Sequence, residues 1–188
     1  MTTPTHPHLR WLPAVAFAIA TLVTAACGTG DEDVIRLGAD RPGPDLDALQ
    51  NDLADGSDVD LPFTTLAGGP ANFTDYAGMP LVINFFARSC AACVSEMPEF
   101  EEVFRSFDGA VAFVGISTDP RKSDAEILVA ETGVTYDLGW DPSAELFDHF
   151  GGFAMPTTIF VSADGVVRET WSGVLTAADL TAKIEELG

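Results

Sequence analysis

Basic residues are scarce in this sequence of 188 residues, which has nine Lys and Arg against 29 Asp and Glu and a formal net charge of −20. A protein that follows nucleic-acid phosphates needs a surface rich in Lys and Arg, so this shortage excludes nucleic acid as a partner. It also argues against docking on anionic lipid through a basic patch. Cysteine is scarce too, and because three is an odd number, at least one thiol has no partner within the chain.

A long apolar run is also missing from the N-terminal segment. The apolar stretch 12–26 has fifteen residues, whereas a membrane-spanning helix needs about 20. It follows His6, His8 and Arg10 and ends in small residues. A basic start, a short apolar stretch and a small-residue end are typical of a secretory signal peptide, which we expect at residues 1–26.

Cys27 follows this stretch directly. The residues Leu22 to Cys27 resemble a bacterial lipobox, in which small residues precede a cysteine that is acylated after cleavage, although Thr24 stands where an aliphatic residue is preferred. We therefore expect lipid on Cys27, which would tether the mature chain to the outer face of the cell membrane. Cleavage after Ala26 without acylation, and an uncleaved anchor, stay open as alternatives.

An acidic segment follows the predicted signal peptide. Ten acidic residues and only two basic residues lie between Asp31 and Asp60, where Gly and Pro are also dense. Such a segment cannot bury enough apolar area to offset the entropy lost on ordering. The sequence therefore predicts a flexible acidic linker at 27–60 and a folded domain at 61–188.

The domain alternates between strand and helix patterns. Continuous apolar runs predict buried strands, and Ser123, Asp141 and Thr176 are placed to cap helices. The expected strands are 81–86, 111–117, 156–161 and 166–171, and the expected helices are 90–106, 123–132, 142–150 and 176–187. This order predicts an α/β fold, with a central mixed sheet flanked by helices.

Two of the cysteines form a CxxC motif, Cys90-Ala91-Ala92-Cys93, where the first strand gives way to a helix. The partial positive charge of the helix N-terminus favours a thiolate, so the pKa of Cys90 should fall below the free value of about 8.5. Cys90 would then attack a disulfide, and Cys93 would resolve the mixed disulfide. A structural disulfide is one alternative. A zinc site is another, for which only Cys27 and His149 remain as further ligands.

The stretch Asn84–Pro98, N-F-F-A-R-S-C-A-A-C-V-S-E-M-P, resembles the active site of thioredoxin-fold proteins of the TlpA/ResA/DsbE branch. Further matches to this branch are 114–119, 155–158 and 164–165. The resemblance covers residues 61–188. It implies a thioredoxin-like fold, with a cis-proline before a C-terminal β-hairpin.

The resemblance also implies roles for the neighbours of the cysteines. Pro156 would be the cis-proline, and the backbone of Met155 would pair with a substrate peptide. Glu96 matches an acid that tunes the thiols and relays a proton, with an exposed helical Glu as the alternative. Ser89 replaces the family's Trp and so removes an apolar platform for the substrate. Arg88 either stabilises the thiolate or is simply an exposed residue at the strand end.

By this resemblance the protein is an extracytoplasmic thiol–disulfide oxidoreductase, with no cofactor beyond the Cys90–Cys93 pair. Its partners would be protein thiols or disulfides and a membrane electron donor or acceptor, and we expect a monomer. Family members mostly reduce specific substrates, such as apocytochrome c before haem attachment, although related proteins oxidise secreted cysteines. The direction of electron flow stays open.

Other functions of related folds stay open as well. A peroxiredoxin-like thiol peroxidase would need a Pro and a Thr or Ser where this sequence has Ile83 and Ala87. A copper-binding chaperone would use two thiolates and a distant histidine such as His149, because soft sulfur suits Cu(I). Such chaperones usually space their cysteines by three residues, not two. A redox-inactive binding module is the last alternative.

Overall fold

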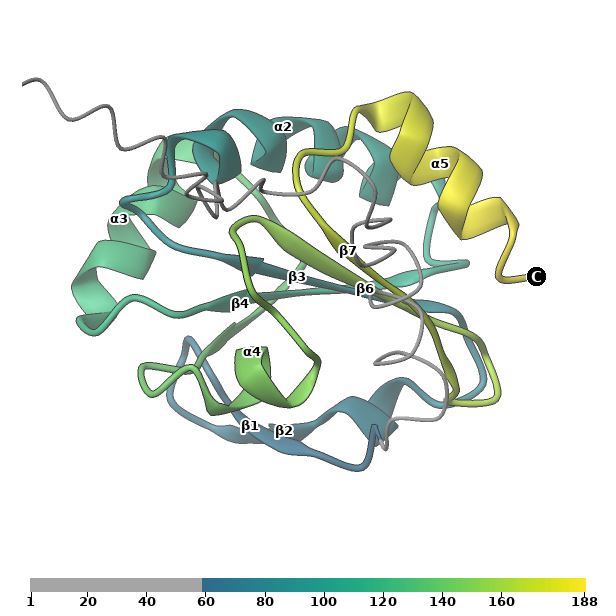
Figure 1. Cartoon of the computed structure of the whole chain (residues 1–188), viewed down its shortest axis with the longest axis horizontal. Helices are drawn as coiled ribbons and strands as arrows, with labels where there is room; N and C mark the ends of the chain where they lie inside the picture. Colours follow the sequence, from purple (N-terminus) through teal and green to yellow (C-terminus); the bar gives the residue numbers. More distant parts are fainter. Residues whose placement is uncertain (1–58) are drawn as a thin grey trace, which may run out of the picture. The chain divides into compact units, whose positions relative to one another are not determined.

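The computed structural model describes residues 59–188 (Figure 1). The predicted signal peptide, Cys27 and nearly all of the predicted linker lie outside the described residues. Val59 is buried and Asp60 accepts a hydrogen bond of 2.9 Å from the Asn72 side chain, so these two residues of the predicted linker pack with the domain. Between residues 59 and 188, no helix is both long and apolar enough to cross a membrane.

A seven-stranded mixed sheet forms the centre of the domain, in the order β2-β1-β5-β4-β3-β6-β7. Its strands are β1 Pro62–Thr65, β2 Pro70–Asn72, β3 Leu81–Phe86, β4 Ala112–Ser117, β5 Asp137–Trp140, β6 Thr157–Val161 and β7 Val167–Ser172. β3, β4 and β5 run parallel, while β1, β2, β6 and β7 pair antiparallel with their neighbours. The predicted mixed sheet is confirmed.

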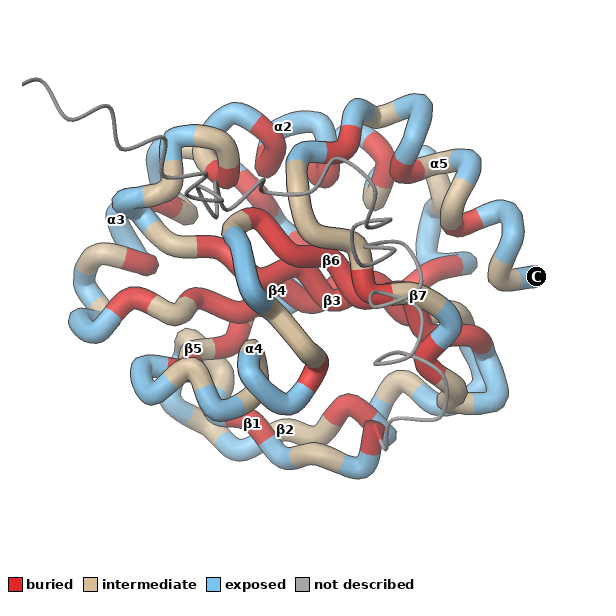
Figure 2. Tube along the Cα trace, viewed as in Figure 1, coloured by how far each residue is buried: buried red, intermediate tan, exposed pale blue. Residues whose placement is uncertain are grey.

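Helices cover both faces of this sheet, as predicted (Figure 1). They are η1 Phe73–Tyr76, α2 Ala91–Ser106, α3 Lys122–Thr132, α4 Glu145–His149 and α5 Ala177–Glu185. We call the side of β3 that packs against α2 and α5 the upper face, and the side that packs against η1 and α4 the lower face. The central strands β3, β4 and β6 are buried along their whole length (Figure 2).

The alternation of side chains along β3 builds a separate core on each face. Val82 and Phe86 belong to the upper core, and Ile83 and Phe85 belong to the lower core. All four are 0% exposed. Successive side chains of a strand point to opposite faces, so the continuous apolar run that predicted this strand is what a strand covered on both sides requires.

Three strands have no counterpart in the sequence prediction: β1, β2 and β5. Each has only three or four residues, and Pro70 and Gly139 lie within two of them. Gly and Pro are depleted in strands, and so short a segment carries no measurable periodicity. Pairing with neighbouring strands forms these elements, so their local sequence does not reveal them.

Two predicted helix starts are wrong. α3 begins at Lys122 after Arg121, which makes no side-chain cap, so Ser123 lies inside the first turn. α4 begins at Glu145, three residues after the predicted start, because the Asp141 carboxylate binds amides further along the chain. The predicted cap of the last helix is confirmed, since Thr176 forms a capping box at the start of α5.

Candidate active site

The cysteine pair lies at the start of α2 and forms a disulfide, with the two Cα atoms 5.3 Å apart. Cys90 is the N-cap residue of this helix, and its Sγ accepts a hydrogen bond of 3.1 Å from the Cys93 backbone N–H. Cys93 is 1% exposed, whereas Cys90 is partly exposed. The first cysteine is therefore the more accessible sulfur, which fits its predicted role as nucleophile, and the Cys93 N–H can donate to a thiolate at this position.

Three chain segments meet at the end of the sheet where Cys90 lies. The loop to Cys90 leaves the carboxyl end of β3, β6 starts beside it with Thr157 opposite Phe85, and β7 ends there with Ser172 opposite Thr157. The Gly173 N–H donates a hydrogen bond of 2.8 Å to the Pro156 carbonyl. Segments distant in sequence thus surround the disulfide.

The predicted cis-proline is confirmed, because the Met155–Pro156 peptide bond is cis. The Met155 side chain is partly buried and packs against both the upper and the lower core. Within the described part of the chain, neither the backbone N–H nor the carbonyl of Met155 has a hydrogen-bond partner. The rest of the described domain therefore makes no use of these two groups.

Glu96 is buried, with only 2% of its surface exposed, so the alternative of an exposed helical Glu is wrong. One carboxylate oxygen accepts a hydrogen bond of 3.1 Å from the Asn84 side-chain amide, and the other accepts one of 2.8 Å from the Leu175 N–H. Burial raises the pKa of Glu96 to about 7, even though both of these hydrogen bonds lower it. A group that exchanges a proton near neutral pH therefore lies one helical turn from Cys93.

The structure turns Arg88 toward α3. Its guanidinium nitrogens lie 3.8 Å from the Asp124 carboxylate and 3.6 Å from the Glu131 carboxylate. The side chain is therefore paired with α3, which favours a structural role over one at the thiolate. Ser89, next to it, is exposed and provides no apolar surface beside Cys90.

The role of Asp119 goes beyond its place in the 114–119 match to the family. The Asp119 side chain is buried, and both of its oxygens accept the Arg88 N–H, at 3.1 and 3.0 Å. The Ser117 hydroxyl donates to the same carboxylate at 2.9 Å. The sequence signal for this role is the pair of polar residues, Ser117 and Asp119, at the end of the buried strand β4. That end of a parallel sheet lies beside the loop that carries the active site.

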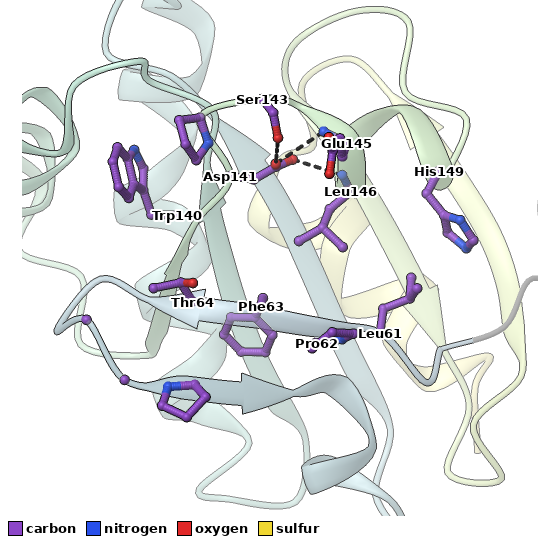
Figure 3. A pocket seen from close by; sticks show the side chains of 14 residues that line it. Leu61, Pro62, Phe63, Thr64, Trp140, Asp141, Ser143, Glu145, Leu146 and His149 are labelled. Carbon is purple, nitrogen blue, oxygen red and sulfur yellow. Dashed lines mark hydrogen bonds between the residues drawn. The ribbon is translucent and has the colours of Figure 1, made fainter.

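A cleft with a volume of about 830 Å³ lies elsewhere, between β1–β2 and the chain that leads into α4 (Figure 3). None of the residues that line it is a cysteine. Its buried carboxylate, Asp141, accepts backbone N–H groups of Glu145, Leu146 and Phe147 at 3.1, 3.0 and 3.3 Å. These bonds cap α4, so this carboxylate has a structural role in the cleft.

The peroxidase and copper-chaperone alternatives depend on the residues at positions 83, 87 and 149. Ile83 is fully buried in the lower core, and Ala87, like Ile83, has no hydroxyl with which to assist a peroxide. The His149 ring, at the end of α4, packs edge-on against Phe150 with 5.3 Å between the ring centroids.

Comparison with known proteins finds thiol–disulfide oxidoreductases among the relatives of this chain. ResA of Oceanobacillus iheyensis, a thiol-disulfide oxidoreductase, is 25% identical over 175 residues, which are 93% of this chain and 82% of that protein. A DsbF homologue from Corynebacterium diphtheriae is 28% identical with a TM-score of 0.64 and covers 71% of this chain and 87% of its own. A thiol:disulfide interchange protein of the thioredoxin family from Chlorobium tepidum TLS is 23% identical with a TM-score of 0.62, covering 71% and 95%.

The family assignment rests on a match to a family model over more than half of the chain. A model of the AhpC/TSA family matches residues 55–170, which include the cysteine pair and Pro156. The solved structures show the thioredoxin-like fold that the resemblance implied. The chain therefore belongs to the AhpC/TSA family, and it has the thioredoxin-like fold and the CxxC disulfide of thiol–disulfide oxidoreductases of the ResA and DsbE type.

Proposed function

We propose that this protein exchanges disulfides with protein cysteines outside the cytoplasm, with Cys90 as nucleophile and Cys93 as resolving thiol. One observation carries the proposal: a partly exposed and a buried cysteine form a disulfide at the N-terminus of α2, at the same end of the sheet as Met155 with its unpaired backbone. Nucleophile, resolving thiol and a place for the substrate backbone are thus present together.

The proposed reaction starts from the reduced pair. The Cys90 thiolate attacks one sulfur of a substrate disulfide, which forms a mixed disulfide and releases the other substrate sulfur as a thiolate. The Cys93 thiolate then attacks the Cys90 sulfur and releases the second substrate thiolate. Two electrons move to the substrate, which becomes a dithiol after taking up two protons, while the enzyme becomes the Cys90–Cys93 disulfide. A dithiol donor at the membrane would reduce it again.

Glu96 supports a reducing direction. A buried carboxylate one turn from Cys93 disfavours a nearby thiolate and so destabilises the reduced pair, which lowers the reduction potential. We assign Glu96 as the group that accepts the proton of the Cys93 thiol, because its own pKa of about 7 matches that task. Neutralising it in Glu96→Gln should raise the reduction potential and slow the resolving step above pH 7.

The test of the reaction is reduction of insulin or a disulfide peptide by the full chain. Cys90→Ser should abolish turnover, and Cys93→Ser should accumulate a mixed disulfide that mass spectrometry detects. Cys27→Ser is the matched control, because it removes the third cysteine and should leave turnover unchanged. Equal turnover in the wild type and in Cys90→Ser would refute the mechanism.

The direction of electron flow is tested by equilibration against a glutathione series. A reduction potential of about −270 mV, as in thioredoxin, would support a reductant. A value of about −120 mV, as in DsbA, would contradict the reducing direction and indicate an oxidant.

We further propose that lipid on Cys27 holds the domain at the outer face of the membrane and that its client is the cysteine pair of an apocytochrome c. Support comes from the signal-like residues 1–26 and from the family resemblance. Mass spectrometry of the mature N-terminus should find an acylated Cys27, and a free, unmodified Cys27 would contradict the anchor. Deletion of the gene should remove c-type cytochromes, and the wild type but not Cys90→Ser should restore them.

A further inference from the structure

Two buried aspartates follow neighbouring parallel strands at the end of the sheet where Cys90 lies. Asp119 lies two residues after β4 and Asp141 lies directly after β5, and each residue is 5% exposed. A buried carboxylate costs free energy unless it is paired or hydrogen-bonded, so each of them needs donors. Both accept backbone N–H groups, but from different segments. Asp141 binds amides of α4, whereas Asp119 binds the N–H of Arg88 in the loop that leads to Cys90.

The loop that Asp119 holds is a four-residue turn that ends on the reactive cysteine. The Cys90 N–H donates a hydrogen bond of 3.0 Å to the Ala87 carbonyl, which closes the turn 87–90. Arg88 is the second residue of this turn, and its N–H takes no part in that bond. Both oxygens of Asp119 accept this N–H instead, at 3.1 and 3.0 Å. The turn that carries Cys90 is thereby bound to the end of β4.

The Asp119 carboxylate continues the pairing of β3 with β4 beyond the ends of both strands. Where the two strands end, the Thr118 N–H donates a hydrogen bond of 3.0 Å to the Phe86 carbonyl. Two residues after Phe86, the Asp119 side chain takes the place of a backbone carbonyl as the acceptor for Arg88. A hydrogen bond to a charged acceptor is roughly twice as strong as one between neutral groups. The turn is therefore held more strongly than a further backbone bond would hold it.

Asp119 is itself held by residues of the sheet. The Ser117 hydroxyl donates to its carboxylate at 2.9 Å and accepts its N–H at 3.1 Å. The Trp140 indole N–H donates to its carbonyl at 2.7 Å. A reacting group is placed precisely when the residues that support it are themselves locked by hydrogen bonds and packing. β4 and β5 together thus give the carboxylate a fixed position from which to hold the turn.

From these contacts we infer that Asp119 is a positioning residue for Cys90, which holds the turn 87–90 so that the Cys90 sulfur stays at the N-cap of α2. The inference rests on the proposed function, because it concerns the nucleophile of that reaction. At the N-cap, the Cys90 Sγ accepts the Cys93 N–H at 3.1 Å and lies in the partial positive charge of the helix N-terminus. A turn without its acceptor lets the sulfur leave this position, which makes the thiolate less stable.

The test is the pH profile of iodoacetamide alkylation at Cys90 in the reduced full chain, with the alkylated cysteine assigned by mass spectrometry. Asp119→Ala removes the acceptor and should raise the pKa of the Cys90 thiol. A rise of about one cuts the thiolate fraction at pH 6 about tenfold, while the higher nucleophilicity of the thiolate returns about threefold. Alkylation should therefore be about threefold slower at pH 6 and about threefold faster at pH 10.

Asp119→Asn separates positioning from charge. The amide oxygen can still accept the Arg88 N–H, while the negative charge, which disfavours a nearby thiolate, is gone. Alkylation of this variant at pH 6 should be as fast as in the wild type or faster. If Asp119 acted through its charge, both Asp119→Ala and Asp119→Asn would be faster than the wild type at pH 6, and that result would overturn the inference.

Asp141→Ala is the matched control. It removes a carboxylate that is equally buried and also binds backbone amides, but on α4, so the pH profile of Cys90 should stay unchanged. Ser117→Ala removes only the hydroxyl that orients Asp119, and it should slow alkylation at pH 6 by a smaller factor than Asp119→Ala does. This variant keeps the inference testable if circular dichroism shows that Asp119→Ala does not fold.

Two different failures can be told apart. A pH profile that stays unchanged in folded Asp119→Ala would show that Asp119 only stabilises the fold and would overturn its positioning role. Equal slowing in Asp119→Asn and Asp119→Ala, or in Asp141→Ala and Asp119→Ala, would overturn it as well. A wild type that is alkylated as expected but reduces no disulfide peptide would overturn the proposed function and not the positioning of Cys90.

Discussion

The two faces of the sheet differ in what they bury. Under α2, the upper face holds a carboxylate, Glu96, in hydrogen bonds with Asn84 and Leu175. Contacting rings occur on both faces, such as Phe100 and Phe113 on the upper face, and they fill the lower face, with centroids 4.8 Å apart for Phe63 and Phe73 and 5.8 Å for Phe73 and Phe150. A buried carboxylate costs free energy even when it is hydrogen-bonded, whereas buried rings stabilise the fold directly.

This difference separates reactivity from stability. The cysteine pair and the group that titrates near neutral pH share the upper face. The lower face contributes packing on the other side of the same strands, because β3 sends alternate side chains to each. Substitutions on the lower face should therefore change stability but not redox properties, and those at Glu96 should change both.

Phe85→Ala should give the largest loss of stability. Phe85 is fully buried on the lower face, with its ring centroid 5.6 Å from that of Phe147 and 6.1 Å from that of Phe150. We expect a loss of about 3–5 kcal/mol in the free energy of unfolding of the oxidised protein, measured with urea, and no change in reduction potential. Phe153→Ala, the exposed control, should change stability by less than about 0.5 kcal/mol. A changed reduction potential in Phe85→Ala would contradict the prediction that the lower face does not affect redox properties.

Glu96→Gln should increase stability at pH 8, by about 2 kcal/mol after allowing for one lost acceptor. The pKa of Glu96 rises from 4.5 to about 7 on folding, so between these values the folded state binds more protons than the unfolded state. Wild-type stability should therefore fall as pH rises from about 4.5 through 7, and this part of the fall should be absent in the variant. Urea unfolding across this pH range measures the difference.

A control for this pH dependence is available on the same helix. Glu102 is exposed on α2, and Glu102→Gln should leave the pH dependence as in the wild type. A Glu96→Gln protein whose stability fell with pH as steeply as that of the wild type would show that another group titrates there.

Asp141→Ala should lower stability by about 1–2 kcal/mol, because the α4 amides at Glu145, Leu146 and Phe147 lose their acceptor. Disulfide exchange by Cys90 should stay unchanged, since the cleft of Figure 3 contains no cysteine. Thermal unfolding and the insulin assay together measure both effects. Loss of disulfide exchange without loss of stability would instead indicate that the substrate binds in that cleft.

Arg88→Gln should have the smallest effect. Its ion pairs with Asp124 and Glu131 are at the surface, and such pairs contribute less than about 1 kcal/mol. Because the guanidinium is turned toward α3, the rate at which iodoacetamide alkylates Cys90 in the reduced protein should change by less than about twofold. A tenfold slower alkylation would instead indicate that Arg88 stabilises the Cys90 thiolate.

How well the sequence predicted an element depended on where its signal came from. β3, α2 and α5 were predicted within about two residues, because a long apolar run, a helical stripe and a capping box are local patterns. β1, β2 and β5 were missed because strand pairing, not local preference, forms them. The start of α4 was misplaced because Asp141 caps amides four to six residues away.

The candidate site divides in the same way. The CxxC pair at a helix N-terminus is a local pattern that the sequence alone determined, and the family resemblance implied the cis-proline. Only the tertiary structure decided that Glu96 is buried and that Arg88 turns to α3, because partners from other elements set both outcomes. Burial and charge depend on which segments meet, and chain neighbours do not determine that.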